Sequence, residues 1–239
     1  MPLATLFALL SLSTASAQTF VTSVGTEQIP SGPDIGGMNW IRIFNNFEDG
    51  GWWLTYHWSD GTIPGYNAAP MTEDFELDIH SRRRLAEWDD IKDHGIKRCP
   101  DGSFLHAYSI GVTNDSARAA RYSSDWSILA QGWIEEDVTT RAHNDMPIIC
   151  SEPLQAAAFT NHSDFSATVF EIDAEARATI AGSFSGSGHV SGSSWEYVAS
   201  RDQYLVLSES GDGLRWTYYN RDFSLAETGD FIVSSSLDR

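Results

Sequence analysis

Short segments with apolar or alternating side chains recur along the chain, and each is followed by a polar turn. Four of these segments have strand length and occupy comparable points of a repeat of about fifty residues, at 52–56, 104–108, 155–159 and 203–207. The turns that follow them carry Asp60, Asp115, Asp164 and Asp212. An Asp side chain can cap its own turn by accepting backbone hydrogen bonds. The pattern therefore predicts four equivalent turns whose aspartates belong to the scaffold.

A second mark follows each of these turns after one more apolar segment. It is an aspartate, with an aromatic residue after it in every copy except the third, where Ala174 follows; the four are Asp74, Asp125, Asp173 and Asp222. Another strand candidate precedes each pair of marks, at 39–44, 95–99, 146–150 and 195–199. Each unit thus contains about four short strands and no convincing helix.

Units of four antiparallel strands that repeat every 40 to 50 residues or so are typical of a β-propeller. We therefore predict an all-β fold, a small β-propeller with four four-stranded blades, at about residues 35–85, 86–138, 139–185 and 186–236. Residues 19–24 could add an outer strand to the last blade and close the ring. A five-bladed ring with one degenerate blade, or a truncated chain, is the alternative.

The first 17 residues form an apolar run that ends in the small residues Ala15-Ser16-Ala17. This pattern predicts a signal peptide, residues 1–17, cleaved before Gln18, although no Lys or Arg precedes the run. The run is short for a membrane span, and no later segment is better suited. We therefore expect a secreted, extracellular protein in which residues 18–239 form a single propeller domain.

The formal net charge of −18 argues against binding to nucleic acid or to an anionic membrane through bulk electrostatics, because both carry the same sign. Aromatic residues make up 12% of the chain and include nine Trp. Such a content fits a rigid β fold and also a carbohydrate-binding surface, although packing between blades explains most of these rings. We expect a monomer with a carbohydrate ligand or substrate and no cofactor.

Two of the turn segments, Ser210–Trp216 and Tyr122–Trp126, resemble turn motifs of secreted propeller glycosidases, the furanosidase-like and sialidase-like enzymes. The resemblance covers about residues 35–236 at the level of blade repeats, and it implies a propeller fold in which these turns are mainly structural. The chain lacks an arginine set of the kind with which sialidases hold a carboxylate. Pro33-Asp34-Ile35 is only distantly similar to the acidic motif that opens the first blade of furanosidase-like enzymes. The resemblance supports the fold more than an activity.

In a propeller the first strand of each blade lines the central axis. When the four inner strands are aligned on Phe44, Cys99, Cys150 and Ala199, one equivalent position five residues earlier holds Asn39, His94, Asp145 and Ser194. Polar groups that converge on an axis suit a small polar ligand. We therefore predict a substrate-binding set at the start of these strands, consisting of Asn39, Trp40, His94, His143, Asn144, Ser194 and Trp195.

Hydrolysis of a glycosidic bond needs two carboxyl groups that divide the acid and the base or nucleophile roles. We assign Asp145 as base or nucleophile, Glu196 as acid, and Asp93 to tuning or binding. Alternatively, these carboxylates cap strand starts or bind water in the channel. The leading hypothesis is an exo-acting glycoside hydrolase, and a non-catalytic glycan-binding or protein-interaction propeller is the alternative.

A metal site is a further alternative, since His94, His143 and Asp145 have suitable ligand groups. No tight ligand spacing supports it, and we predict a hydrogen-bonded channel histidine and no metal.

The two cysteines, Cys99 and Cys150, fall at the same position of adjacent blades in this alignment. Sheets packed face to face lie about 10 Å apart, whereas a disulfide requires Cα atoms within roughly 7 Å. Blades converge near the axis, so the sequence leaves the pairing open. Two Asn-x-Ser sequons, at Asn114 and Asn161, would carry glycans only in a eukaryotic secretory pathway.

Overall fold

A computed structural model describes most of the repeat region of the chain, within one compact unit that spans residues 37–239. The described residues are 39–46, 51–58, 65–72, 77–86, 91–110, 116–135, 146–161, 166–185, 189–210 and 213–231. The predicted signal peptide and the candidate closing strand at 19–24 lie outside this part of the chain. So do the four aspartates of the first set of turns, Asp60, Asp115, Asp164 and Asp212.

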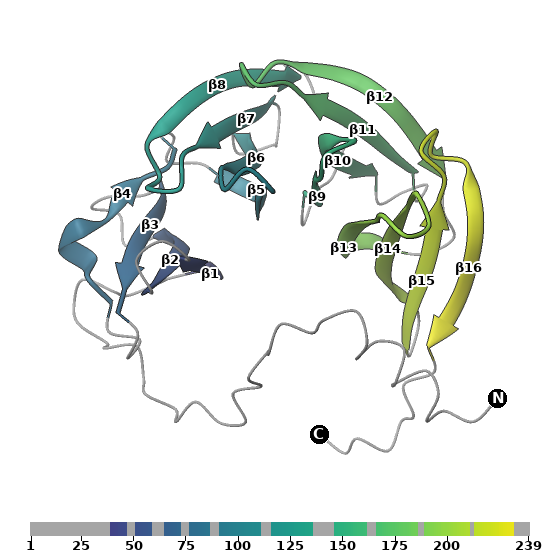
Figure 1. The fold of residues 1–239 in the computed structure, drawn as a ribbon, viewed down its shortest axis with the longest axis horizontal. Helices are drawn as coiled ribbons and strands as arrows, with labels where there is room; N and C mark the ends of the chain where they lie inside the picture. The colour runs from purple at the N-terminus through teal and green to yellow at the C-terminus, as the bar shows by residue number, and fades with distance from the viewer. Residues whose placement is uncertain are drawn as a thin grey trace. The chain divides into compact units, whose positions relative to one another are not determined.

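Four antiparallel sheets, each built from consecutive strands, make up the described structure (Figure 1). The first blade contains β1 (Asn39–Asn46), β2 (Gly51–Trp58), β3 (Gly65–Met71) and β4 (Arg83–Arg84), with the 3-10 turn η1 (Ile79–Ser81) before β4. The second contains β5 (Ile91–Arg98), β6 (Phe104–Ile110), β7 (Ser116–Tyr122) and β8 (Ile128–Glu135). The third contains β9 (Ile148–Cys150), β10 (Gln155–Asn161), β11 (Ser166–Ile172) and β12 (Ala178–Ser185). The fourth contains β13 (His189–Val198), β14 (Gln203–Ser210), β15 (Gly213–Tyr219) and β16 (Leu225–Phe231).

The strand order in every sheet is the order in the sequence, so each repeat forms one blade as an up-and-down meander. No α-helix occurs among the described residues. The prediction of an all-β, propeller-like fold with four four-stranded blades is confirmed.

Successive blades pack face to face through apolar side chains. In β6, alternate residues serve opposite interfaces: Phe104 and Tyr108 pack toward the first blade, and Leu105 and Ala107 pack toward the third. All seven residues of β6 are buried. A strand covered on both faces needs no polar side, which explains why its sequence does not alternate between apolar and polar residues.

Three of the four second-mark turns share one backbone geometry, and the first, at Asp74, lies outside the described residues. Trp126, Ala176 and Phe223 all adopt a positive φ, of 64°, 59° and 63°. In each turn the amide of this residue donates to the carbonyl three positions earlier; the acceptor for Trp126 is Ser123, at 2.9 Å. The third turn therefore corrects our alignment, because Ala176 and not Ala174 occupies the aromatic position. Asp173 corresponds to Ser123 rather than to Asp125.

The acidic side chains of these turns act as caps. The Asp222 carboxylate accepts hydrogen bonds from the Ser224 hydroxyl and amide, at 2.6 and 3.0 Å, and these bonds lower the pKa of Asp222. In the third turn the Asp173 carboxylate accepts from the amide of Arg177 at 2.8 Å. The second-mark acids that the structure describes, Asp125, Asp173 and Asp222, are therefore structural groups.

The residue with positive φ also contacts the preceding blade. The Trp126 ring stacks on Phe104 at 3.9 Å and contacts Phe44 of the first blade at 5.7 Å. Phe223 lies over the outer strand of the third blade, where a β-carbon added to Gly182 would lie 2.6 Å from its ring. The second mark thus joins neighbouring blades.

Cys99 and Cys150 form a disulfide between the second and third blades, with Cα atoms 5.0 Å apart. Our alignment of these strands is wrong by one residue, because Ile96 and Ile148 occupy equivalent places, each packed against the preceding blade. The cysteines are therefore not equivalent. Since successive side chains of a strand point to opposite faces, the offset of one residue directs Cys99 toward the third blade and Cys150 back toward the second.

Candidate functional site

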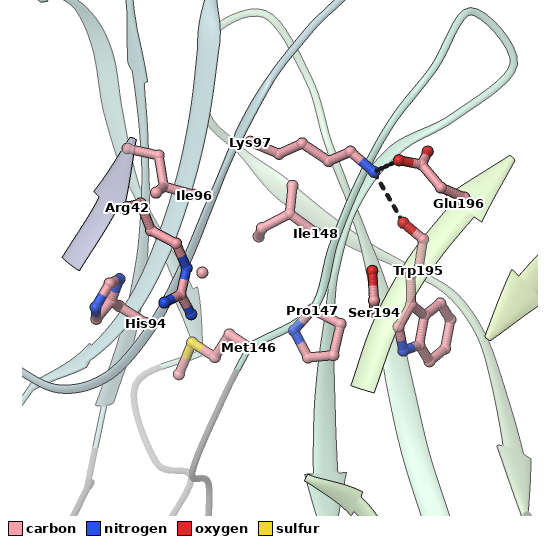
Figure 2. A pocket seen from close by; sticks show the side chains of 11 residues that line it. Arg42, His94, Ile96, Lys97, Met146, Pro147, Ile148, Ser194, Trp195 and Glu196 are labelled. Carbon is pink, nitrogen blue, oxygen red and sulfur yellow. Dashed lines mark hydrogen bonds and ion pairs between the residues drawn. The ribbon is translucent and has the colours of Figure 1, made fainter. Parts of the chain in front are cut away.

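The inner strands of all four blades converge on a cavity of about 410 Å³ (Figure 2). The lining residues are Arg42 from β1, His94, Gly95, Ile96 and Lys97 from β5, Met146, Pro147 and Ile148 at the start of β9, and Ser194, Trp195 and Glu196 from β13. The volume lies within the range of small-molecule sites, roughly 300–1,000 Å³.

Irregular strand pairing places several of the polar side chains in this cavity. In three of the four inner strands the register shifts just before the cavity, between Asn39 and Arg42, Ile91 and His94, and His189 and Ser194. A bulge bends a strand and redirects the next side chain. Arg42, His94 and Ser194 are the first regularly paired residues after these shifts, and all three line the cavity.

Gly95 permits the close approach of the second and third inner strands. A β-carbon at this position would lie 1.6 Å from the carbonyl oxygen of Met146. No other residue type fits this approach without a shift of the backbone. Gly95 therefore brings β5 and the start of β9 into direct contact at the cavity wall.

An ion pair crosses the cavity between the second and fourth blades. Lys97 Nζ lies 2.7 Å from Glu196 Oε1, and it also donates to the Trp195 carbonyl at 2.8 Å (Figure 2). Because the Glu196 side chain is 62% exposed, the pair contributes at most about 1 kcal/mol to stability. Its main effect is to hold an ammonium and a carboxylate group in place at the cavity.

A buried cluster of Tyr and His rings packs against His94. The His94 ring lies 4.3 Å from Tyr66 and 5.7 Å from His106, and the Tyr108 and Tyr122 rings surround His106. Burial raises the pKa of Tyr66 and Tyr122 above the usual range. Burial, with a smaller contribution from His94, lowers the pKa of His106 well below its ordinary value. These three groups are therefore neutral in the folded protein at pH 7.

His106 should make the stability of the protein depend on pH. Because the pKa of His106 is depressed on folding, only the unfolded chain takes up a proton as the pH falls below about 6.5. The free energy of unfolding should be at its full value above that pH and decline below it, by up to about 1.4 kcal/mol per pH unit from this group. Urea unfolding between about pH 5 and 8 measures the slope.

The variant His106→Phe removes the titrating group and keeps a buried ring, so the slope should become shallower. The variant His80→Asn, at an exposed position of η1, should retain the slope of the parent protein. An identical pH dependence of the parent and His106→Phe would contradict a neutral buried His106.

Four of the sequence-predicted site residues line the same cavity: His94, Ser194, Trp195 and Glu196. Trp195 contributes its backbone carbonyl to the Lys97 contact, while its indole is only 2% exposed and packs between the third and fourth blades. It is therefore unsuited to stacking on a sugar.

The other predicted residues fall where no side chain is described. Asn39 and Trp40 lie in β1 and Asp93 lies in β5, and nothing is described beyond their backbone. His143, Asn144 and Asp145 lie outside the described residues and directly precede the cavity residue Met146. Their assignments remain predictions.

The sequence analysis missed the basic residues Arg42 and Lys97. Both stand within the segments that were recognised as inner strands, two or three positions beyond the polar residues that were considered. The predicted site rested on carboxylates and other polar residues at one equivalent position of the inner strands, which excludes Arg42 and Lys97. A count of charges along the inner strands would have identified both cations.

Several of the described Trp side chains serve packing. Trp53, Trp126 and Trp195 are buried in the cores between blades. Trp133 is 42% exposed, and the Arg118 guanidinium lies 3.9 Å from its ring centroid.

In the described ranges, no three side chains among His, Cys, Asp and Glu come together in a manner that could hold a metal ion. His143 and Asp145, which belong to the alternative metal site, lie outside these ranges. Of the residues that the structure describes, none belongs to a helix with the length and apolar character needed to cross a bilayer.

No protein-family model matches the sequence, and no curated protein matches it either. Among solved structures, the calcium-binding protein regucalcin from Agrobacterium tumefaciens is 11% identical, with a TM-score of 0.45 over 74% of this chain and 56% of that one. A protein assigned as a 6-phosphogluconolactonase from Bacteroides fragilis is 13% identical, with a TM-score of 0.46 over 79% and 56%. One assigned as an exo-β-1,3-galactanase from Bifidobacterium bifidum is 8% identical, with a TM-score of 0.46 over 83% and 71%.

These structures are propeller-like, and the likeness concerns the fold alone. The chain spans 56% of the length of regucalcin and of the Bacteroides fragilis protein.

Proposed function

We propose that the protein is a secreted, carbohydrate-binding propeller that takes one end of a glycan into its axial cavity. The observation that carries the proposal is the convergence of Arg42, His94 and Ser194, from three blades, on the cavity beside the Lys97–Glu196 pair. Fixed donors and acceptors in a concave site are what the hydroxyl groups of a sugar require. The volume of about 410 Å³ suits a ligand of one or two sugar rings.

Secretion is part of this proposal. The apolar run at residues 1–17 supports it, and the Cys99–Cys150 disulfide does so too, because structural disulfides are typical of oxidising compartments. We propose that the protein acts as a monomer on carbohydrate, without nucleic acid or a membrane as partner. The net charge of −18 supports the exclusion of both anionic partners.

Glycoside hydrolysis is the second candidate function, and the position of Glu196 at the cavity favours it. The Glu196 carboxylate accepts from the Lys97 ammonium group, which suits it to orient a ligand or to act as a nucleophile better than to donate a proton. Hydrolysis therefore needs a further carboxyl group as the acid. The sequence analysis assigned Asp145 as base or nucleophile and Asp93 to tuning or binding, and either could take the role of the acid instead.

A variant that fills the cavity tests the binding site independently of its chemistry. Ser194→Trp should reduce binding on a glycan array at least tenfold, because a large ring would occupy the space of the ligand. Ser200→Trp, at an exposed position of the same blade, is the matched control and should bind as the parent protein does. Equal binding by both variants would place the glycan site elsewhere.

Aryl glycosides, assayed beside the array, test the second candidate. Turnover by the parent protein that Asp145→Asn and Glu196→Gln both abolish would establish a hydrolase. Glycan binding without any turnover would establish recognition as the function.

A further inference from the structure

The described side chains that line the cavity carry a net charge opposite to that of the chain as a whole. The protein has 33 Asp and Glu against 15 Lys and Arg. Among the described lining residues, however, Arg42 and Lys97 are cationic, and Glu196 is the one carboxylate. An acidic protein that collects basic side chains at its axis provides a local site for an anion.

The basic side chains come from separate strands and point toward a common space. Figure 2 shows the Arg42 guanidinium directed into the cavity, with the His94 ring near it on the same side. The Lys97 ammonium lies at the opposite end, where Glu196 and the Trp195 carbonyl hold it. A guanidinium group offers two parallel donors to a planar anion, and an ammonium group adds a compact charge.

The fold directs Arg42 and His94 into the cavity, and packing holds His94 in place before any ligand arrives. Strand irregularities direct Arg42 and His94 into the cavity, and the ring of Tyr66 packs against His94 at 4.3 Å. Preorganised donors lose less conformational entropy on binding, so they discriminate better between a charged and a neutral ligand.

We infer that the ligand of this cavity is an acidic sugar, whose anionic group lies between Arg42 and Lys97. The inference rests on the proposed carbohydrate function. The shared chemistry is a pair of anionic oxygens, which a uronic acid supplies as a carboxylate and a sulfated sugar supplies as a sulfate ester. Arg42 accounts for most of the preference for the anion, while Glu196 opposes it and keeps Lys97 in place.

Titration calorimetry on the full chain tests the inference with matched ligands. The panel consists of glucuronic, galacturonic and mannuronic acids, their neutral parent sugars, the 6-sulfates of those parents, and glutarate as a dicarboxylate that is not a sugar. At least one acidic sugar should bind tenfold or more tightly than its neutral parent, as expected for hydrogen bonds to a charged group. A preference for the uronic acid or for the sulfate identifies the source of the anion.

Three variants, each of which removes one charge, test the contribution of individual charged groups to binding. Arg42→Gln should weaken binding of the acidic sugar about tenfold or more and weaken binding of the neutral parent much less, because Gln still offers a polar group but no charge. Glu196→Gln should strengthen binding of the acidic sugar several-fold, because the substitution removes the opposing carboxylate. Arg177→Gln removes one positive charge from an exposed turn and serves as the control that binds like the parent protein.

The outcomes distinguish the two proposals. Equal binding of acidic and neutral sugars, abolished for both by Ser194→Trp, overturns the inference and keeps the carbohydrate site. Binding of glutarate but of no sugar overturns the carbohydrate proposal and the acidic-sugar inference with it, and binding of nothing in the panel has the same meaning. A variant Arg42→Gln that binds the acidic sugar as tightly as the parent protein does also overturns the inference.

Discussion

The variant Trp126→Ala is expected to unfold with a free energy about 3–5 kcal/mol lower than that of the parent protein, the range typical of a buried aromatic residue replaced by alanine. The Trp126 side chain is 2% exposed, stacks on Phe104 of its own blade and contacts Phe44 and Trp53 of the preceding one. Its removal leaves a cavity between the first and second blades that the surrounding β-sheets cannot close. Urea or thermal unfolding measures the loss when it is followed by far-ultraviolet circular dichroism, a backbone signal that both proteins share, and not by Trp fluorescence.

Trp133→Ala is the matched control for this prediction. Trp133 lies on the outer strand of the same blade and is 42% exposed, with Arg118 over its ring. Loss of an exposed cation–π contact costs on the order of 1 kcal/mol or less. Comparable losses in the two variants would show that the second-mark aromatic does not hold the blades together.

Removal of the disulfide, in the double variant Cys99→Ala/Cys150→Ala, should lower the free energy of unfolding by about 2–5 kcal/mol. The bond closes a segment with a sequence separation of 51 residues. Constraining such a loop in the unfolded chain is worth roughly 4 kcal/mol in the chain-entropy description. Thermal unfolding of the parent protein with and without a phosphine reductant gives an independent value.

Two controls accompany this prediction. The reductant should not change the melting temperature of the double variant, which has no bond to lose. Thiol titration of the native protein should find no reactive thiol, because both cysteines of the chain are paired. Two titratable thiols in freshly purified protein would contradict the bond.

The blade repeat was predictable because its signals are local. Turn residues such as Asp125 and Asp222 accept hydrogen bonds from neighbours two positions along the chain, so their effect is contained in a few consecutive letters. The third copy misled the alignment because its acid and its positive-φ residue, Glu175 and Ala176, lack the Asp-aromatic pair of the other turns. The backbone geometry of the third turn nevertheless matches that of the second and fourth turns.

The site was only partly predictable, because the direction of a strand side chain depends on every irregularity before it. A shift of one residue turns a side chain to the opposite face. The alignment assumed that the inner strands are regular and treated Cys99 and Cys150 as equivalent, whereas the true offset of one residue lets them bond. Three of the residues predicted from the start of the inner strands, His94, Ser194 and Glu196, do line one cavity.

The sequence by itself determined four units of four strands, the position of a turn after each third strand, and the excess of negative charge. These properties follow from periodicity, turn chemistry and composition, which neighbouring residues or simple counts define. Only the tertiary structure decided that Lys97 and Glu196, from the second and fourth blades, form an ion pair, and that Arg42 joins them around one cavity. The physical reason is that bulges and the packing between blades set which side chains reach the axis, and neither is written in any single segment.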